Sequence, residues 1–134
     1  PRGPDGEEVP YDLEIPFPGA LHVLYCTIPG WGRVASTIQR GVYLSDHVEY
    51  EIKSMGGPDE PFQEVRKYKR YSEFDQFHNT FCVEAVADLP PKMFSFFNMH
   101  HTFVNWRMAG LQQYINTVLK SPRHCRHMID FLTS

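Results

Sequence analysis

The chain lacks long apolar runs, a strong net charge and a pattern of paired cysteines, and each of these shortages excludes a class of protein. No apolar segment approaches the roughly 18 uncharged residues of a membrane-spanning helix, so we expect any membrane contact to come from the aqueous side. Net charge is −3, without the basic excess of a nucleic-acid-binding domain. Cys26, Cys82 and Cys125 lie far apart with no C-x-x-C pair, which favours reduced thiols in a cytosolic protein.

Catalytic signatures are missing as well. The sequence contains no Gly-rich phosphate loop, no H-E-x-x-H and no G-x-S-x-G motif. Its one metal-capable group, His124-Cys125-x-His127, has a spacing that matches no common zinc site, and Cys125 fits the apolar face of a helix. We therefore expect no enzyme activity, no cofactor and no metal ion.

What the chain does have is the size and composition of a single globular domain. It comprises 134 residues, of which 42% are hydrophobic and 14% aromatic. Residues 1–19 contain five prolines and five acidic residues against one arginine, with no sustained period. This composition predicts a tail or linker over 1–19 and a folded domain over 20–134. Because the chain begins with Pro1, we interpret it as part of a longer protein.

Apolar and polar residues alternate in the first half of the chain, which is typical of strands with one wet face. The alternation predicts three strands, at about 20–28, 48–52 and 62–71. The glycine-rich stretch 30–41 fits no single period.

From Ser72 onward, apolar residues recur at helical spacing instead. Ser72 and Asp75 resemble the capping box that starts a helix. A second helix is predicted with Asn105 as its cap, and a third opens at Ser121-Pro122, because proline suits the first helical position. The predicted fold class is α+β, with a small three-stranded antiparallel sheet packed against about three to four helices.

Three cations stand out from the rest. In the basic run 66–70, most side chains fit a solvated strand, but Arg70 stands where strand passes into helix, beside Tyr71. Lys92 follows two prolines that stiffen its backbone, although a random loop lysine is the ordinary interpretation. Arg107 falls in the first turn of its predicted helix, near the buried edge, where a cation opposes the helix dipole. A bound anion such as phosphate would remove that conflict.

Between Lys92 and Arg107 lies an uncharged segment rich in aromatic residues. Such a patch is seldom left without a partner, and each phenylalanine moved out of water contributes roughly 1.5 to 3 kcal/mol. Three alternatives remain: insertion into a membrane, completion of the core, or entry into a partner protein's groove. Within this segment, the His100-His101 pair is either a polar surface or a site that strengthens membrane binding below about pH 6.5. The residues predicted to insert are Phe94, Phe96, Phe97, Met99 and Phe103.

Three motifs in order resemble the phox-homology (PX) domain of sorting nexins and NADPH oxidase subunits. They are Arg70-Tyr71-Ser72-Glu73-Phe74, Leu89-Pro90-Pro91-Lys92 and Arg107-x-x-x-Leu111-x-x-Tyr114-Ile115. The resemblance extends from about Leu21 to Leu132. It implies the PX fold and a non-catalytic module that binds phosphoinositides, most often phosphatidylinositol 3-phosphate, and targets a larger cytosolic protein to early endosomes or related vesicles.

The resemblance also implies a role for each site residue. Arg70 would hold the 3-phosphate, Tyr71 would stack under the inositol ring, and Lys92 would meet the 1-phosphate. Arg107 would hydrogen-bond the 4- and 5-hydroxyls, and the aromatic segment would enter the membrane. The segment after Pro91 lacks the further prolines of SH3 ligands. The alternative function is a protein–protein interaction module that uses the same aromatic segment and binds lipid weakly or not at all.

Overall fold

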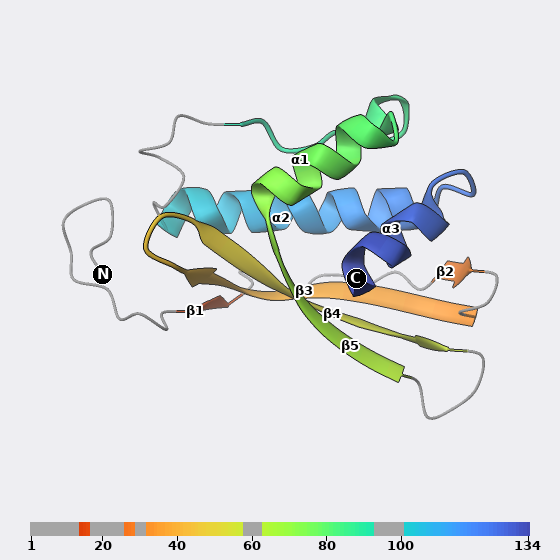
Figure 1. The fold of residues 1–134 in the computed structure, drawn as a ribbon, viewed down its shortest axis with the longest axis horizontal. Helices are drawn as coiled ribbons and strands as arrows, with labels where there is room; N and C mark the ends of the chain where they lie inside the picture. The colour runs from red at the N-terminus through yellow and green to blue at the C-terminus, as the bar shows by residue number, and fades with distance from the viewer. Residues whose placement is uncertain (1–13, 17–25, 29–31, 58–62, 93–100) are drawn as a thin grey trace.

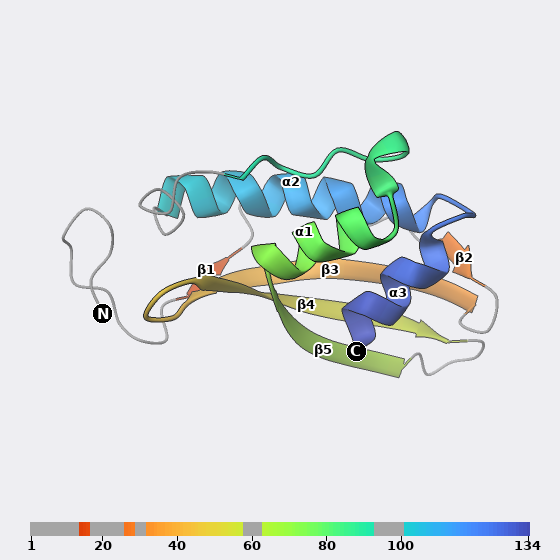
Figure 2. The ribbon, with the colours of Figure 1, turned by 45° about the horizontal axis from the view of Figure 1, so that its top comes forward.

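Three long antiparallel strands form the sheet, in a computed structural model that describes residues 14–16, 26–28, 32–57, 63–92 and 101–134. They are β3 (Gly32–Tyr43), β4 (Val48–Gly57) and β5 (Gln63–Arg70). Two short strands, β1 (Glu14–Pro16) and β2 (Cys26–Ile28), pair with β3. The three helices lie over one face of this sheet (Figures 1 and 2). The predicted α+β class, with its three-stranded sheet, is confirmed.

The strand predictions differ in outcome along the chain. The alternating stretches at 48–52 and 62–71 form β4 and β5, and the ambiguous stretch 30–41 supplies most of β3. Of the predicted strand 20–28, the structure describes 26–28 alone, as β2. Within the segment predicted as a tail, three residues form β1 and pair with β3.

The helices are α1 (Tyr71–Thr80), α2 (His101–Leu119) and α3 (Cys125–Thr133), with a short 3₁₀ helix, η1, at Val83–Ala85. No helix in the described ranges is both long and apolar enough to cross a bilayer. The helix starts predicted at Ser72, Asn105 and Pro122 were all wrong.

Each correction has a local cause. At α1 the cap is Arg70, not Ser72, because the carboxylate of Glu73 accepts the Arg70 backbone N–H at 3.0 Å. The α2 helix begins at His101, so Asn105 lies inside the helix and cannot cap it. The chain after α2 makes a turn before α3, in which the Ser121 carbonyl accepts the N–H of both His124 and Cys125.

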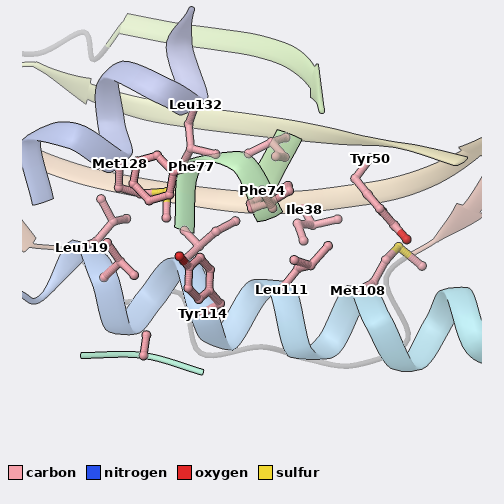
Figure 3. Close-up of a cluster of buried hydrophobic side chains, with 14 of the residues drawn as sticks. Ile38, Tyr50, Phe74, Phe77, Met108, Leu111, Tyr114, Leu119, Met128 and Leu132 are labelled. Carbon is pink, nitrogen blue, oxygen red and sulfur yellow. The ribbon is translucent and has the colours of Figure 1, made fainter. Parts of the chain in front are cut away.

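The core lies between the sheet and the helices. Figure 3 shows side chains from β3, β4 and all three helices meeting there, and the labelled residues that are fully buried include Ile38, Tyr50, Phe74, Met108 and Leu111. A buried amide also fixes α2 on β3: Gln112 accepts the Ile38 N–H at 2.7 Å and donates to the Ser36 carbonyl at 2.9 Å. These contacts hold α2 against the sheet and thereby position its first turns beside the junction of β5 and α1.

Lys69 is an exception to the prediction that the basic run is solvated. It pairs with Tyr50 in the register of β4 and β5 and is buried. Its ammonium donates to the backbone carbonyl and the hydroxyl of Ser134 at 3.2 and 3.1 Å, and lies 4.9 Å from the centre of the Phe131 ring. These partners replace the water that a strand lysine usually keeps.

Arg66, in contrast, belongs to a cluster on the sheet face that the helices leave open. The carboxylate of Glu51, 3% exposed, accepts hydrogen bonds from Arg66 at 3.1 Å, from Arg40 at 2.7 Å and from the Tyr68 hydroxyl at 2.5 Å. Burial raises the pKa of Glu51, but these hydrogen bonds outweigh it and hold the pKa below its ordinary value. Arg66 is thus occupied by a structural partner.

His124 is buried, and we expect it to make the stability of the fold sensitive to acid. The side chain is 2% exposed, and neither ring nitrogen has a hydrogen-bond partner among the described residues. Burial lowers its pKa, and the charges of Arg123 and His127 lower it further. Because the unfolded chain binds this proton first, we expect the free energy of unfolding to fall as pH drops below about 6.5, with no further loss once pH is below the folded-state pKa.

Urea denaturation at a series of pH values checks this expectation. In His124→Leu, the fall in the free energy of unfolding below about pH 6.5 should be clearly smaller than in the wild type. The exposed neighbour provides the control, since His127→Gln should keep most of the dependence. Equal pH dependence in the wild type and His124→Leu would show that His124 is not responsible.

Candidate functional site

Tyr71 lies where three parts of the chain meet. It is the first residue of α1 and directly follows Arg70, the last residue of β5. Its ring faces α2, with the guanidinium carbon of Arg107 3.9 Å from the ring centre. Its hydroxyl donates to the carbonyl of Pro90, two residues before Lys92. The three motifs that are separate in the sequence are therefore joined through this one side chain.

Arg107 is held between aromatic rings. Although charged, it is only 4% exposed, and its guanidinium carbon lies 4.4 Å from the centre of the Phe103 ring on α2 as well as against Tyr71. Burial lowers the pKa of Arg107, while Tyr50 and Tyr71 oppose that effect. Burial likewise raises the pKa of Tyr50 to about 12, against the nearby charge of Arg107. The arrangement keeps a planar cation fixed in a largely dehydrated place.

Arg70, the residue before Tyr71, is half-buried. It pairs with Glu49 in the register of β4 and β5. The turn between β3 and β4 is close enough for its charge to act there: a hydrogen bond with His47 lowers the pKa of Asp46, and Arg70 lowers it further. The Arg70 backbone is tied to Glu73, so its position does not depend on its side chain.

Lys92 and the aromatic segment complete the list of predicted residues. Lys92 is exposed and follows the buried Pro90 and the exposed Pro91. Phe103 lies in the first turn of α2, half-buried, with its ring centre 5.6 Å from that of Trp106, so part of its surface is used for packing. Its insertion into a membrane stays a prediction. The other residues predicted to insert, Phe94, Phe96, Phe97 and Met99, lie outside the described residues, as does His100.

Gly110 is a positioning residue that the sequence analysis missed. A Cβ atom at this position of α2 would lie 2.6 Å from the Cγ atom of Pro90 and 3.4 Å from its Cβ atom. Glycine thus allows the proline segment to approach the helix closely, while Tyr71 holds the Pro90 carbonyl. The sequence signal was a glycine inside a segment whose apolar residues recur at helical spacing, where glycine costs about 1 kcal/mol relative to alanine.

Replacing Gly110 by alanine should displace the segment that carries Lys92, because a proline ring has no flexible end that can turn away. On an open helix the same change stabilises by about 0.5 to 1 kcal/mol. Here overpacking of about 1 to 3 kcal/mol is expected to cancel or exceed that gain. Thermal denaturation measures the balance, with Ala109→Ser at the exposed neighbouring position as the control. A clear rise in melting temperature for Gly110→Ala would contradict the close contact.

Comparison with known proteins agrees with this geometry. A family model described as the PX domain matches residues 60–134, which include all three motifs. An X-ray structure of a designed CISK-PX domain superposes with a TM-score of 0.61 at 25% identity, covering 74% of this chain and 98% of the other. The resemblance inferred from the motifs is thereby confirmed.

Curated relatives include proteins of different overall function. The sorting nexin MVP1 of Yarrowia lipolytica is 32% identical over 92 residues, covering 63% of this chain and 14% of that protein. The PX domain-containing protein kinase-like protein of Mus musculus is 31% identical over 110 residues, which cover 80% of this chain and 17% of that protein. The chain therefore spans only a small part of the length of these relatives. By the family model, the solved fold and the shared motifs, the chain belongs to the PX domain family, whose members bind phosphoinositides in membranes.

Proposed function

We propose that the chain binds phosphatidylinositol 3-phosphate and thereby brings a larger protein to the cytosolic face of early endosomes or related vesicles. The observation that carries the proposal is the guanidinium of Arg107, buried against the ring of Tyr71. Holding a cation there costs stability, and a ligand whose oxygens face that cation offsets the cost. The names of two relatives, a sorting nexin and an endosomal/vacuolar adapter protein of Vanderwaltozyma polyspora, support the trafficking role.

Each side chain has a part in this proposal. The guanidinium of Arg70 offers a planar fork for the dianionic 3-phosphate, and Lys92 supplies a point charge for the 1-phosphate. Tyr71 provides a ring face for the inositol. Arg107, from its position against that ring, hydrogen-bonds the 4- and 5-hydroxyls, and its closeness leaves little room for phosphates at those two positions. The proposed preference is therefore for the 3-phosphate alone.

Vesicle flotation tests the proposal directly. We expect the chain to float with vesicles that contain phosphatidylinositol 3-phosphate and to stay unbound with unmodified phosphatidylinositol, the 4-phosphate or the 4,5-bisphosphate. Equal flotation with all four lipids would show non-specific charge attraction. Failure to float with any of them would favour the alternative of a protein–protein interaction module.

The aromatic segment supplies the second attachment in the proposal. On a membrane, headgroup binding and apolar insertion occur together, so their contributions to the association constant multiply. In solution, only headgroup binding contributes. The double variant Phe96→Ala, Phe97→Ala should lose vesicle binding by a large factor, since each buried phenylalanine contributes roughly 1.5 to 3 kcal/mol. Its affinity for a soluble short-chain phosphatidylinositol 3-phosphate, measured by calorimetry, should hardly change. Equal losses in both assays would mean that these residues pack within the protein.

A further inference from the structure

The helix α2 has a second surface that the proposed lipid site does not use. On the side of α2 that faces away from the sheet runs segment 84–91, which starts in η1 and continues without regular secondary structure (Figures 1 and 2). Between this segment and the helix lies a groove of about 690 Å³, here called the α2 groove. Residues 84–91 line one side of the groove, and residues of α2 that include Trp106, Gly110 and Tyr114 line the other.

Exposed apolar side chains gather at this groove. Three large hydrophobic residues are exposed among those the structure describes: Tyr68, Val86 and Trp106. Tyr68 lies on the open sheet face and donates its hydroxyl to Glu51. The other two, 36% and 51% exposed, both line the α2 groove. A tryptophan left half in water beside a concave surface is typical of a contact that a partner completes, and tryptophan is the residue that most often dominates such contacts.

Charge indicates the kind of partner. The lining of the groove includes the carboxylates of Glu84 and Asp88 and contains no lysine, arginine or histidine. An anionic membrane surface would be repelled by these carboxylates, whereas a basic polypeptide would be attracted. The groove is therefore unsuited to the lipid that the Tyr71 site is proposed to bind.

We propose that the α2 groove binds a segment of another protein that places apolar side chains on Trp106 and Val86 and a lysine or arginine near Glu84 and Asp88. Such a segment would pack apolar side chains against Trp106 and would pair its positive charge with Glu84 and Asp88. This surface differs from the aromatic segment considered above as a protein-binding element. One helix then offers its sheet-side residues to a lipid headgroup and its outer side to a partner protein.

Selection from a random-peptide phage library on the immobilised wild-type domain provides the probes. We expect enriched peptides to combine apolar residues with lysine or arginine. Synthetic versions should bind Trp106→Ala about tenfold or more weakly than the wild type. The double variant Glu84→Gln, Asp88→Asn should bind them more weakly and with less dependence on salt. Tyr68→Ala, which changes an exposed aromatic residue elsewhere, should bind them as the wild type does.

Three results would overturn the proposal. They are a selection without enrichment, enrichment of acidic peptides, and equal affinity of the peptides for the wild type and Trp106→Ala. A vesicle experiment separates the membrane from the protein as the partner of Trp106. If Trp106→Ala loses binding to vesicles but keeps its affinity for the peptides, the tryptophan serves the membrane and the proposal fails, whatever the outcome for the lipid site.

Discussion

Arg70→Ala is expected to lose headgroup binding by roughly 2 to 5 kcal/mol, as when one partner of a buried charge pair is removed. The lower figure corresponds to a factor of about 30 in dissociation constant. The fold should persist, because Glu73 caps α1 through the Arg70 backbone N–H and not through its side chain. Calorimetric titration with soluble short-chain phosphatidylinositol 3-phosphate measures the loss, and thermal denaturation verifies the fold.

Arg66→Ala is the matched control for this loss. Arg66 lies four residues earlier on the same strand, carries the same charge and is paired with Glu51 on the open sheet face. If the site is where we place it, removing Arg66 leaves headgroup affinity nearly unchanged. Equal losses for the two variants would mean that general positive charge, and not a located phosphate contact, drives binding.

Arg107→Met should separate stability from function. Methionine has a similar length and no charge, so it fills the space between Tyr71 and Phe103 without the cost of burying a guanidinium. We expect the melting temperature to stay equal or to rise, while headgroup affinity falls by roughly 2 to 5 kcal/mol. Burial is the main cause of the lowered pKa of Arg107, which means that the folded environment disfavours its charge. This supports the expectation that an uncharged side chain of similar length does not destabilise the fold.

Arg107→Lys keeps the charge and removes the planar fork. If Arg107 acts by hydrogen-bonding two neighbouring hydroxyls, lysine should recover only part of the lost affinity. Full recovery would reduce its role to charge alone. A large drop in melting temperature for Arg107→Met would instead indicate that the guanidinium supports the fold, which would contradict the assignment of this residue to a ligand.

The sequence allowed most of the fold to be predicted, because local patterns determine most of it. The alternation through β4 and β5 and the helical spacing after Ser72 reflect which side chains face the core. The start of α2 was missed because Asn105 is a residue type that caps helices, while residues 101–104 contain no Asp, Glu, Lys or Arg and gave no sign that the helix begins earlier. The burial of Lys69 could not be predicted, since its partners Ser134 and Phe131 come from the far end of the chain.

The candidate site was predictable for a different reason. Its residues were found by resemblance to a family, and the structure brings Tyr71, Arg107 and the Pro90 segment into contact. What spacing alone did not show is how these parts are held together. The close approach of Pro90 to Gly110 and the position of Arg107 between two rings are contacts between segments distant in sequence. Only the packed chain reveals them.

Nuclear magnetic resonance titration with soluble short-chain phosphatidylinositol 3-phosphate is the most direct test of the central claim, that one headgroup site forms around Tyr71. We predict saturable chemical-shift changes for the backbone amides of Arg70 and Tyr71, for Lys92 and for the Arg107 side-chain N–H groups. The signals of Glu51 and of its partners Arg40, Arg66 and Tyr68 should not change. The 4-phosphate isomer should produce much smaller shifts at the same concentrations. Shifts confined to other surfaces, or equal shifts with both isomers, would contradict the account.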